Sequence, residues 1–310
     1  MYIVELLTAM HAGEVRKQLV GVIGGPVSPF KPDLSLDYAA LEKNIAATLR
    51  YPFPALLSAA GIAEFQALTP EEVVESARVA LVVSAGKALV IGTAGFNADI
   101  GRTLARNLEK AGVHALLVMP SYYPNASEAG LMRYYEAIGQ STGLPLIIYS
   151  RDWVIPSPEM VGRLAERLPN LIAWKDGQGD IRRYQRIMRL TGDRLAWLGG
   201  SGDDSAPGYY AIGVQGYTSS LSNVMPKLAM AMGKAGAAED FAELNRLVNR
   251  YVHPIFRLRE KVRGYDVAVL KRAMEMFGIA AGPTRPPLAS LDPATESDLT
   301  ALKPVLAEMV

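Results

Sequence analysis

The sequence contains no cysteine and only three histidines, His11, His114 and His253. The absence of cysteine excludes disulfides, thiolate nucleophiles and Cys-ligated metal sites. No pair of histidines has the spacing of two metal ligands on one helix face or strand, so we expect no metal. No Ser–His–acid arrangement can be argued from such scattered residues either.

Excess charge of either sign is also lacking, because 32 Lys and Arg stand against 31 Asp and Glu, for a formal net charge of +1. This balance gives no reason to expect nucleic acid or an anionic membrane as a partner. Residues 1–10 include Glu5 and have no basic segment of the secretory type. The longest uncharged stretch, residues 205–226, is broken by Gly, Pro and polar residues, so it predicts no membrane span. We therefore expect a cytoplasmic protein.

Half of the 310 residues are apolar, and many of them form short continuous runs that alternate with longer amphipathic segments. Continuous runs bounded by Gly, Pro or Asn are typical of parallel strands that are buried on both faces. The eight runs are residues 20–23, 55–59, 88–92, 115–119, 144–149, 171–174, 195–198 and 214–219. Eight strands, each followed by a helix, predict a (β/α)8 TIM barrel of the α/β class, which takes about 250 residues. A doubly wound sheet is the alternative.

Several helix starts can be located from capping residues. In Thr69-Pro70-Glu71-Glu72, Thr69 is the expected N-cap, with Pro at the first helical position and acids in the first turn. Ser157-Pro158-Glu159 repeats this pattern, and Ser127-Glu128 predicts another start.

We expect residues 1–235 to form the barrel, with residues 1–18 as a lead-in, and residues 236–310 to form a C-terminal helical extension. Residues 239–277 have a polar-faced helical pattern. The segment Gly282-Pro283-Thr284-Arg285-Pro286-Pro287 cannot be a helix or an inner strand, which predicts a rigid extended tail.

In such a barrel the active site lies at the carboxyl ends of the strands. The sixth predicted strand, residues 171–174, is followed directly by Lys175. A lysine at a poorly solvated barrel mouth has a lowered pKa, so its free amine becomes available as a nucleophile. The alternative is a solvated lysine paired with Asp176.

The fifth predicted strand ends in Tyr149, followed by Ser150-Arg151-Asp152. Consecutive strands are neighbours, so Tyr149 is expected beside Lys175, where a phenol can relay a proton. The alternative is that it only packs. Arg151 could bind a carboxylate through two hydrogen bonds, or pair with Asp152 at the surface.

Two further segments offer polar groups at the same end of the barrel. Gly199-Gly200-Ser201-Gly202-Asp203-Asp204-Ser205 precedes a helix and could hold an anion, although a turn with helix caps is as compatible and the two aspartates oppose a phosphate. It is no dinucleotide motif, since Ser205 stands where the last glycine belongs. Thr218 and Ser219, in Gly216-Tyr217-Thr218-Ser219-Ser220, offer hydroxyls for substrate, with packing as the alternative.

Taken together, the segments along the chain resemble the dihydrodipicolinate synthase/N-acetylneuraminate lyase superfamily, and within it the 5-dehydro-4-deoxyglucarate dehydratases. The resemblance runs from about Leu19 to the C-terminus and depends on the order and spacing of the matches. They are Gly21-Val22-Ile23-Gly24, Pro26-Val27-Ser28-Pro29-Phe30, Glu64-Phe65, Leu68-Thr69-Pro70, Asn125-Ala126-Ser127, Tyr149-Ser150-Arg151-Asp152, Lys175-Asp176-Gly177-Gln178-Gly179-Asp180, Gly192-Asp193-Arg194-Leu195 and Ala281-Gly282-Pro283-Thr284-Arg285-Pro286-Pro287-Leu288.

The resemblance implies a lyase in which Lys175 forms an imine with the 2-keto group of a keto-acid, with no external cofactor. Tyr149 would relay the proton, and Ser201, Thr218 and Ser219 would contact substrate. In the dehydratases a hydroxyl and a carboxylate are then lost, which gives 2,5-dioxopentanoate, carbon dioxide and water. Tyr123, in the pair Tyr122-Tyr123, resembles a superfamily tyrosine that reaches a neighbouring subunit's site. This implies a homo-oligomer, commonly a tetramer built from dimers.

One motif departs from the superfamily pattern Gly-x-Thr-Gly-Glu, whose amides and threonine hydroxyl hold the substrate's α-carboxylate. Here the loop is Ala60-Gly61-Ile62-Ala63-Glu64, so both outer glycines are alanine and the hydroxyl is absent. The amides of Gly61 and Ile62 can still donate, while the isoleucine side chain can intrude. Three alternatives therefore remain. The protein could be an aldolase or hydratase-aldolase, a dihydrodipicolinate synthase-like enzyme for another keto-acid, or a catalytically weak keto-acid-binding protein.

Overall fold

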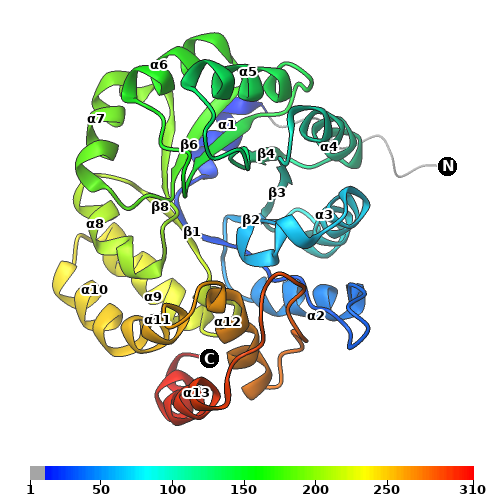
Figure 1. Cartoon of the computed structure of the whole chain (residues 1–310). Coiled ribbons are helices and arrows are strands. Elements are labelled where there is room, and N and C mark those ends of the chain that lie inside the picture. Colours follow the sequence, from blue (N-terminus) through cyan, green and yellow to red (C-terminus); the bar gives the residue numbers. More distant parts are fainter. Residues whose placement is uncertain (1–10) are drawn as a thin grey trace.

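The computed structural model describes residues 11–310, which form a closed barrel of eight parallel strands surrounded by helices (Figure 1). The expectation that residues 1–10 are no secretory signal lies outside the described residues. The strands are β1 (Gly21–Gly24), β2 (Ala55–Leu57), β3 (Leu89–Ala94), β4 (Ala115–Val118), β5 (Leu146–Ser150), β6 (Leu171–Asp176), β7 (Ala196–Gly199) and β8 (Gly216–Ser219).

The barrel closes where β1 pairs with β8, in a register that runs from Gly21 opposite Gly216 to Gly24 opposite Ser219. Five of the eight strands (β2 to β6) are buried at every position, as continuous apolar runs predict for strands covered on both faces. The predicted (β/α)8 barrel is thus confirmed, with all eight strands in place. One boundary differs in a way that matters, because β6 continues through Lys175 to Asp176 and does not end at Trp174.

The predicted helix starts are also correct. The Thr69 hydroxyl accepts a hydrogen bond from the Glu72 amide, and the Glu72 carboxylate accepts one from the Thr69 amide, which completes a capping box. Ser157 and Ser127 cap the helices that begin one residue later.

The short α1 (Ala12–Gln18) precedes β1. The helices that follow the strands are α2 (Tyr38–Thr48), α3 (Pro70–Ser84), α4 (Ala98–Ala111), α5 (Glu128–Gly139), α6 (Pro158–Arg167), α7 (Ile181–Thr191), α8 (Ala206–Ala211) and α9 (Pro226–Ala237).

The C-terminal part is helical, as predicted, and lies along one side of the barrel (Figure 1, gold to red). It consists of α10 (Phe241–Leu247), a π-helical turn (Val248–Val252), α11 (His253–Arg259), α12 (Tyr265–Met276) and α13 (Pro293–Leu306). Of these, α12 packs against η1 (Gly61–Ala63), the 3-10 turn that follows β2. The extension therefore touches the carboxyl end of the barrel. The boundary expected at residue 235 stays a prediction.

A buried ion pair joins this extension to the barrel. Glu64 and Lys271 are 1% and 2% exposed, and the Lys271 Nζ lies 2.6 Å from a Glu64 carboxylate oxygen. Lys271 Nζ also donates to the Pro283 carbonyl (2.8 Å), and the Arg285 amide donates to the second Glu64 oxygen (2.8 Å). Three segments of the chain, the β2 loop, α12 and the proline-rich tail, thus meet at one carboxylate.

The tail is held against the barrel by charge and by backbone contact. The Arg285 guanidinium donates to both carboxylate oxygens of Glu72 at 2.6 and 2.7 Å. Lys271 Nζ and Arg285 Cζ each lie 4.2 Å from the centroid of the Phe30 ring. Gly282 has φ +66°, and a Cβ there would lie 1.8 Å from the Phe30 carbonyl oxygen, so this close approach requires glycine.

We predict that Lys271→Ala lowers the free energy of unfolding by about 3–5 kcal/mol, because it leaves the Glu64 charge buried without its partner. Urea unfolding followed by circular dichroism measures this. Lys261→Ala is the matched control, since it removes only an exposed pair with Asp298 that is worth at most about 1 kcal/mol. The double variant Glu64→Gln/Lys271→Met should recover part of the loss. A loss below about 1 kcal/mol in Lys271→Ala would contradict the importance of the pair.

Candidate active site

The site is built on the neighbouring strands β5 and β6, whose register places Tyr149 directly opposite Lys175. The Lys175 Nζ lies 3.8 Å from the centroid of the Tyr149 ring. Both side chains are 5% exposed and face a cavity of about 150 Å³ at the carboxyl end of the barrel. The predicted proximity of these two residues is present in the structure.

Within residues 11–310, no carboxylate lies within ion-pair distance of Lys175. Burial, together with the positive charge of Arg151, lowers its pKa to about 7. Asp176, the partner in the alternative interpretation, instead accepts hydrogen bonds from the Tyr209 hydroxyl (2.8 Å) and the Gly179 amide (3.0 Å). A large fraction of Lys175 is therefore a free amine near neutral pH, and such an amine can attack a carbonyl carbon and form an imine.

Two glycines make room for this pair. A Cβ on Gly200 would lie 2.4 Å from Lys175 Cε, and one on Gly177 would lie 2.7 Å from a carbon of the Tyr149 ring. Any larger residue at either position would displace one of the two side chains. The glycines after β6 and β7 thus serve close packing around the amine.

The Tyr149 hydroxyl donates to the Gly200 carbonyl at 2.7 Å. Burial raises the pKa of this phenol, so it stays protonated at neutral pH. In a relay, a lone pair on this oxygen would take a proton from one substrate group while the hydroxyl proton passes to another.

The loop at residues 60–64, which departs from the superfamily pattern, forms another part of the cavity wall. Gly61 and Ile62 belong to η1, are half-buried and line the cavity. Arg151 also lines it, and its Nη1 would lie 2.9 Å from a Cβ on Gly61. The Arg151 Nε donates to Asp152 at 2.7 Å, which is the pairing that one of the two sequence interpretations expected, while binding of a carboxylate stays a prediction. A guanidinium nitrogen therefore lies against the loop that lacks the usual hydroxyl.

The predicted hydroxyls also line the cavity, but they differ in freedom. Ser201 and Thr218 face it. The Ser219 hydroxyl donates to Asp203, whose second oxygen accepts from the amide and hydroxyl of Ser220, both at 3.1 Å. Asp203 is thus a buried anchor between the loops after β7 and β8, a role that neither sequence interpretation of this segment included.

Tyr123 is placed differently from the other candidates. It is 69% exposed and does not line the cavity of its own chain. Conversely, sequence reasoning missed Arg259 and Asp266, which line the cavity from α11 and α12. No local pattern identifies them, since they reach the barrel mouth only because the extension folds back over it.

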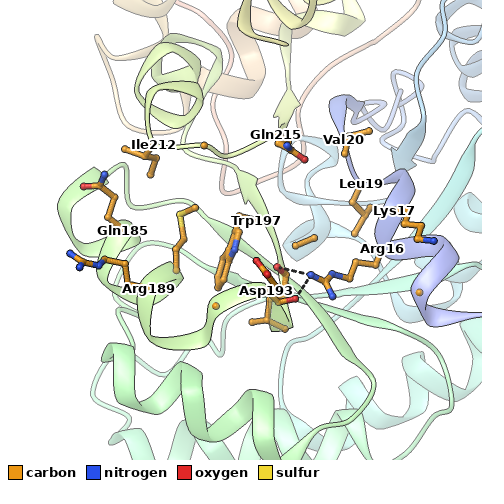
Figure 2. Close-up of a pocket in the computed structure, with 16 residues that line it drawn as sticks. Arg16, Lys17, Leu19, Val20, Gln185, Arg189, Asp193, Trp197, Ile212 and Gln215 are labelled. Carbon is orange, nitrogen blue, oxygen red and sulfur yellow. Dashed lines mark hydrogen bonds between the residues drawn. The ribbon is translucent and has the colours of Figure 1, made fainter. Parts of the chain in front are cut away.

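A larger cavity of about 880 Å³ lies at the amino end of the barrel (Figure 2). Its lining includes Arg16, Lys17, Arg189, Asp193 and Trp197, and the Arg16 guanidinium donates to the carbonyls of Asp193 and Leu195. It contains none of the predicted catalytic residues. Size alone therefore does not identify the reactive site.

Residues 11–310 contain neither a metal-ligand cluster nor a helix suited to crossing a membrane. No group of three or more His, Cys, Asp or Glu in that range could hold a metal ion. In the same range, no helix combines the length and the apolarity that a membrane crossing requires.

Comparisons with known proteins show similarity along most of the chain. A model described as the dihydrodipicolinate synthetase family matches residues 18–306. A Bradyrhizobium sp. protein named "Probable 5-dehydro-4-deoxyglucarate dehydratase" is 36% identical over 284 residues, 91% of each chain. A Ralstonia nicotianae protein of the same name is 35% identical, covering 93% of this chain and 94% of its own. Dihydrodipicolinate synthase from Oceanobacillus iheyensis superposes with a TM-score of 0.91 at 27% identity, over 96% of this chain and 100% of that one.

We predict that imine formation at Lys175 becomes faster as the pH rises and levels off above about pH 7, because the free amine is the reacting form. Trapping with pyruvate and cyanoborohydride, followed by peptide mass spectrometry, gives the rate at each pH. Arg151→Gln should move the midpoint to higher pH, since a positive charge that lowers the pKa is removed. A midpoint near 10, the ordinary range of lysine, would contradict the assignment.

Proposed function

The chain belongs to the dihydrodipicolinate synthetase family of Schiff-base lyases, and from this premise we propose that it dehydrates and decarboxylates 5-dehydro-4-deoxyglucarate to 2,5-dioxopentanoate. The observation that carries the proposal is the buried Lys175 amine, whose pKa is lowered to about 7 and which has no carboxylate partner in the part of the chain that the structure describes. The name shared by the relatives supports the substrate.

In the proposed reaction, Lys175 Nζ attacks the 2-keto carbon, and the keto oxygen leaves as water when the imine forms. The cationic imine is an electron sink, so a proton leaves C3 and an enamine forms. The C4 hydroxyl is expelled as water, and a proton shift from C5 turns the remaining hydroxyl-bearing carbon into a keto group. The carboxylate next to the imine carbon leaves as carbon dioxide, and the carbon that it leaves takes up a proton. Water then releases Lys175 and yields the aldehyde. Overall the dianionic substrate takes up one proton and yields the monoanionic product, carbon dioxide and water.

The surrounding residues have proposed roles that follow from their positions. Tyr149, whose ring lies against Lys175, relays the proton to and from the intermediates. The amides of Gly61 and Ile62 together with Arg151 bind the α-carboxylate. Ser201 and Thr218 bind substrate hydroxyls. Ser219 contributes mainly by holding Asp203, because its own proton is already donated.

Ile62 favours a second candidate, an aldolase or hydratase-aldolase for a less polar keto-acid, because an apolar side chain lines the cavity where the superfamily pattern has a hydroxyl. A panel of keto-acids assayed for both carbon dioxide and pyruvate separates the two activities. A catalytically weak keto-acid-binding protein would release neither.

We further propose that the enzyme uses no external cofactor and acts in the cytoplasm as a homo-oligomer, a tetramer built from dimers. The exposure of Tyr123, which leaves it available to a second subunit, supports a contribution to a neighbouring subunit's site. Sedimentation of the wild type and of Tyr123→Ala, with activity measured in parallel, tests this arrangement.

We predict that Lys175→Ala abolishes turnover, because no other side chain can replace the amine that forms the imine. Borohydride reduction in the presence of pyruvate should label the wild type at Lys175 and leave the variant unlabelled. The double variant Glu64→Gln/Lys271→Met is a control for the second buried lysine and should keep the label, because it leaves no charge of the pair buried without its partner. An adduct that persists in Lys175→Ala, or maps to another lysine, would refute the proposed role.

We predict that Tyr149→Phe lowers kcat by about 10²- to 10⁴-fold, the usual worth of a positioned proton-transfer group. The ring remains in contact with Lys175, so the midpoint of urea unfolding should change little. Single-turnover kinetics separate the chemical step from product release. A Phe variant with full activity would show that this tyrosine only packs.

A further inference from the structure

Part of the wall of the active-site cavity comes from the C-terminal extension. Arg259, the last residue of α11, and Asp266, in the first turn of α12, both line the cavity. The two residues are partly buried, and they come from different helices. The cavity thus has a cation and an anion on the wall formed by the extension.

Arg259 is held in place but is not neutralised by direct contact. Its Nη1 donates to the Ser220 hydroxyl at 2.8 Å, and its guanidinium carbon lies 4.3 Å from the centroid of the Phe256 ring. Within residues 11–310, no carboxylate oxygen lies within ion-pair distance of its nitrogens. Ser220 also donates to Asp203, so a hydroxyl bridges the two opposite charges. The guanidinium therefore keeps donors for a ligand in the cavity.

Four carboxylates lie near enough to act on this guanidinium, namely those of Asp266, Asp203, Asp204 and Glu260. The Asp203 oxygens already accept hydrogen bonds from Ser219, Ser220 and the Leu221 amide. Asp204 is half-buried and does not line the cavity, and Glu260 is exposed. Asp266 is the one that shares the cavity, and no hydrogen bond to its carboxylate is present in the described part of the chain. It is available as an acceptor.

We propose that Arg259 and Asp266 form a distal subsite that selects keto-acids ending in an α-hydroxycarboxylate. The inference deepens the proposed function and rests on it, since an imine at Lys175 and an α-carboxylate at Arg151 direct the other end of the substrate to this wall. Arg259 binds the distal carboxylate through charged hydrogen bonds. Asp266 accepts a hydrogen bond from the hydroxyl on the neighbouring carbon. A keto-acid with a distal carboxylate but no such hydroxyl lacks this contact.

The test compares two six-carbon 2-keto-3-deoxy acids that differ only at the distal end, one with a carboxylate and one with a CH₂OH group. In Arg259→Gln, the kcat/KM ratio of the diacid to the CH₂OH acid should fall by about 10- to 100-fold, the usual worth of a charged hydrogen bond. Most of the change should lie in KM. Arg259→Lys should recover part of the ratio, since it keeps the charge without the planar fork.

Two further variants sharpen the design. Asp266→Leu removes the acceptor and should raise KM for the diacid, while Asp266→Asn keeps an acceptor and should bind the diacid at least as well as the wild type. Arg257→Gln is the matched control, because Arg257 is exposed on the same helix and does not line the cavity. It should leave the ratio unchanged.

Protection of Lys175 from pyruvate trapping by each acid measures binding even where turnover is low. An equal loss for both acids in Arg259→Gln would overturn the distal subsite and show a packing role. So would a wild type that binds the CH₂OH acid as well as the diacid. In both cases the wild type would still form the pyruvate adduct at Lys175. If that adduct is absent, it is the proposed function that fails.

Discussion

The buried pair of Glu64 and Lys271 is the contact on which the architecture of the active-site end depends. A single carboxylate binds the α12 ammonium and the Arg285 amide, and it stands directly after the loop that lines the cavity. Glu64 itself has φ +58°, a left-handed conformation that a glutamate adopts only when its surroundings hold it there. Loss of either partner would free the loop, α12 and the tail together. The extension is therefore part of the substrate cavity as well as a covering for the barrel.

Lys175 and Lys271 are both buried, and their surroundings suit one to a chemical role and the other to a structural role. Burial lowers the pKa of both. Lys271 has Glu64 beside it, whose negative charge favours the ammonium form and makes the residue a structural cation. Lys175 faces the positive charge of Arg151 instead, so burial and the neighbouring charge act in the same direction. Within residues 11–310, Lys271 has a carboxylate partner and Lys175, the proposed nucleophile, has none. The strand register and the loop contacts produce this difference, which the sequence around each lysine does not reveal.

The barrel and the lysine–tyrosine pair could be predicted from the sequence because each depends on local pattern and on strand order. Continuous apolar runs identify strands covered on both faces, and adjacency of the fifth and sixth strands brings Tyr149 to Lys175. Arg259 and Asp266 could not be predicted, since their place in the cavity depends on how the extension folds over the barrel. The role of Asp203 as a buried anchor could not be predicted either, because the four donors that surround it come from the next strand and its loop. Contacts of long sequence separation thus account for what was missed.

The distance along the chain between Glu64 and the residues that neutralise it has a consequence for synthesis. Arg285 follows Glu64 by 221 residues, and the ribosome delivers about 5–20 residues each second. The last strand, β8, ends at Ser219, 66 residues before Arg285, so for about 3–13 s the eight strands can already be present while this carboxylate lacks α12, the tail or both. A nascent barrel at that stage has its reactive lysine but an unfinished cavity wall. Chemical competence therefore arrives late in translation, after the fold is largely complete, and a ribosome that stalls within the extension yields a barrel without a finished site.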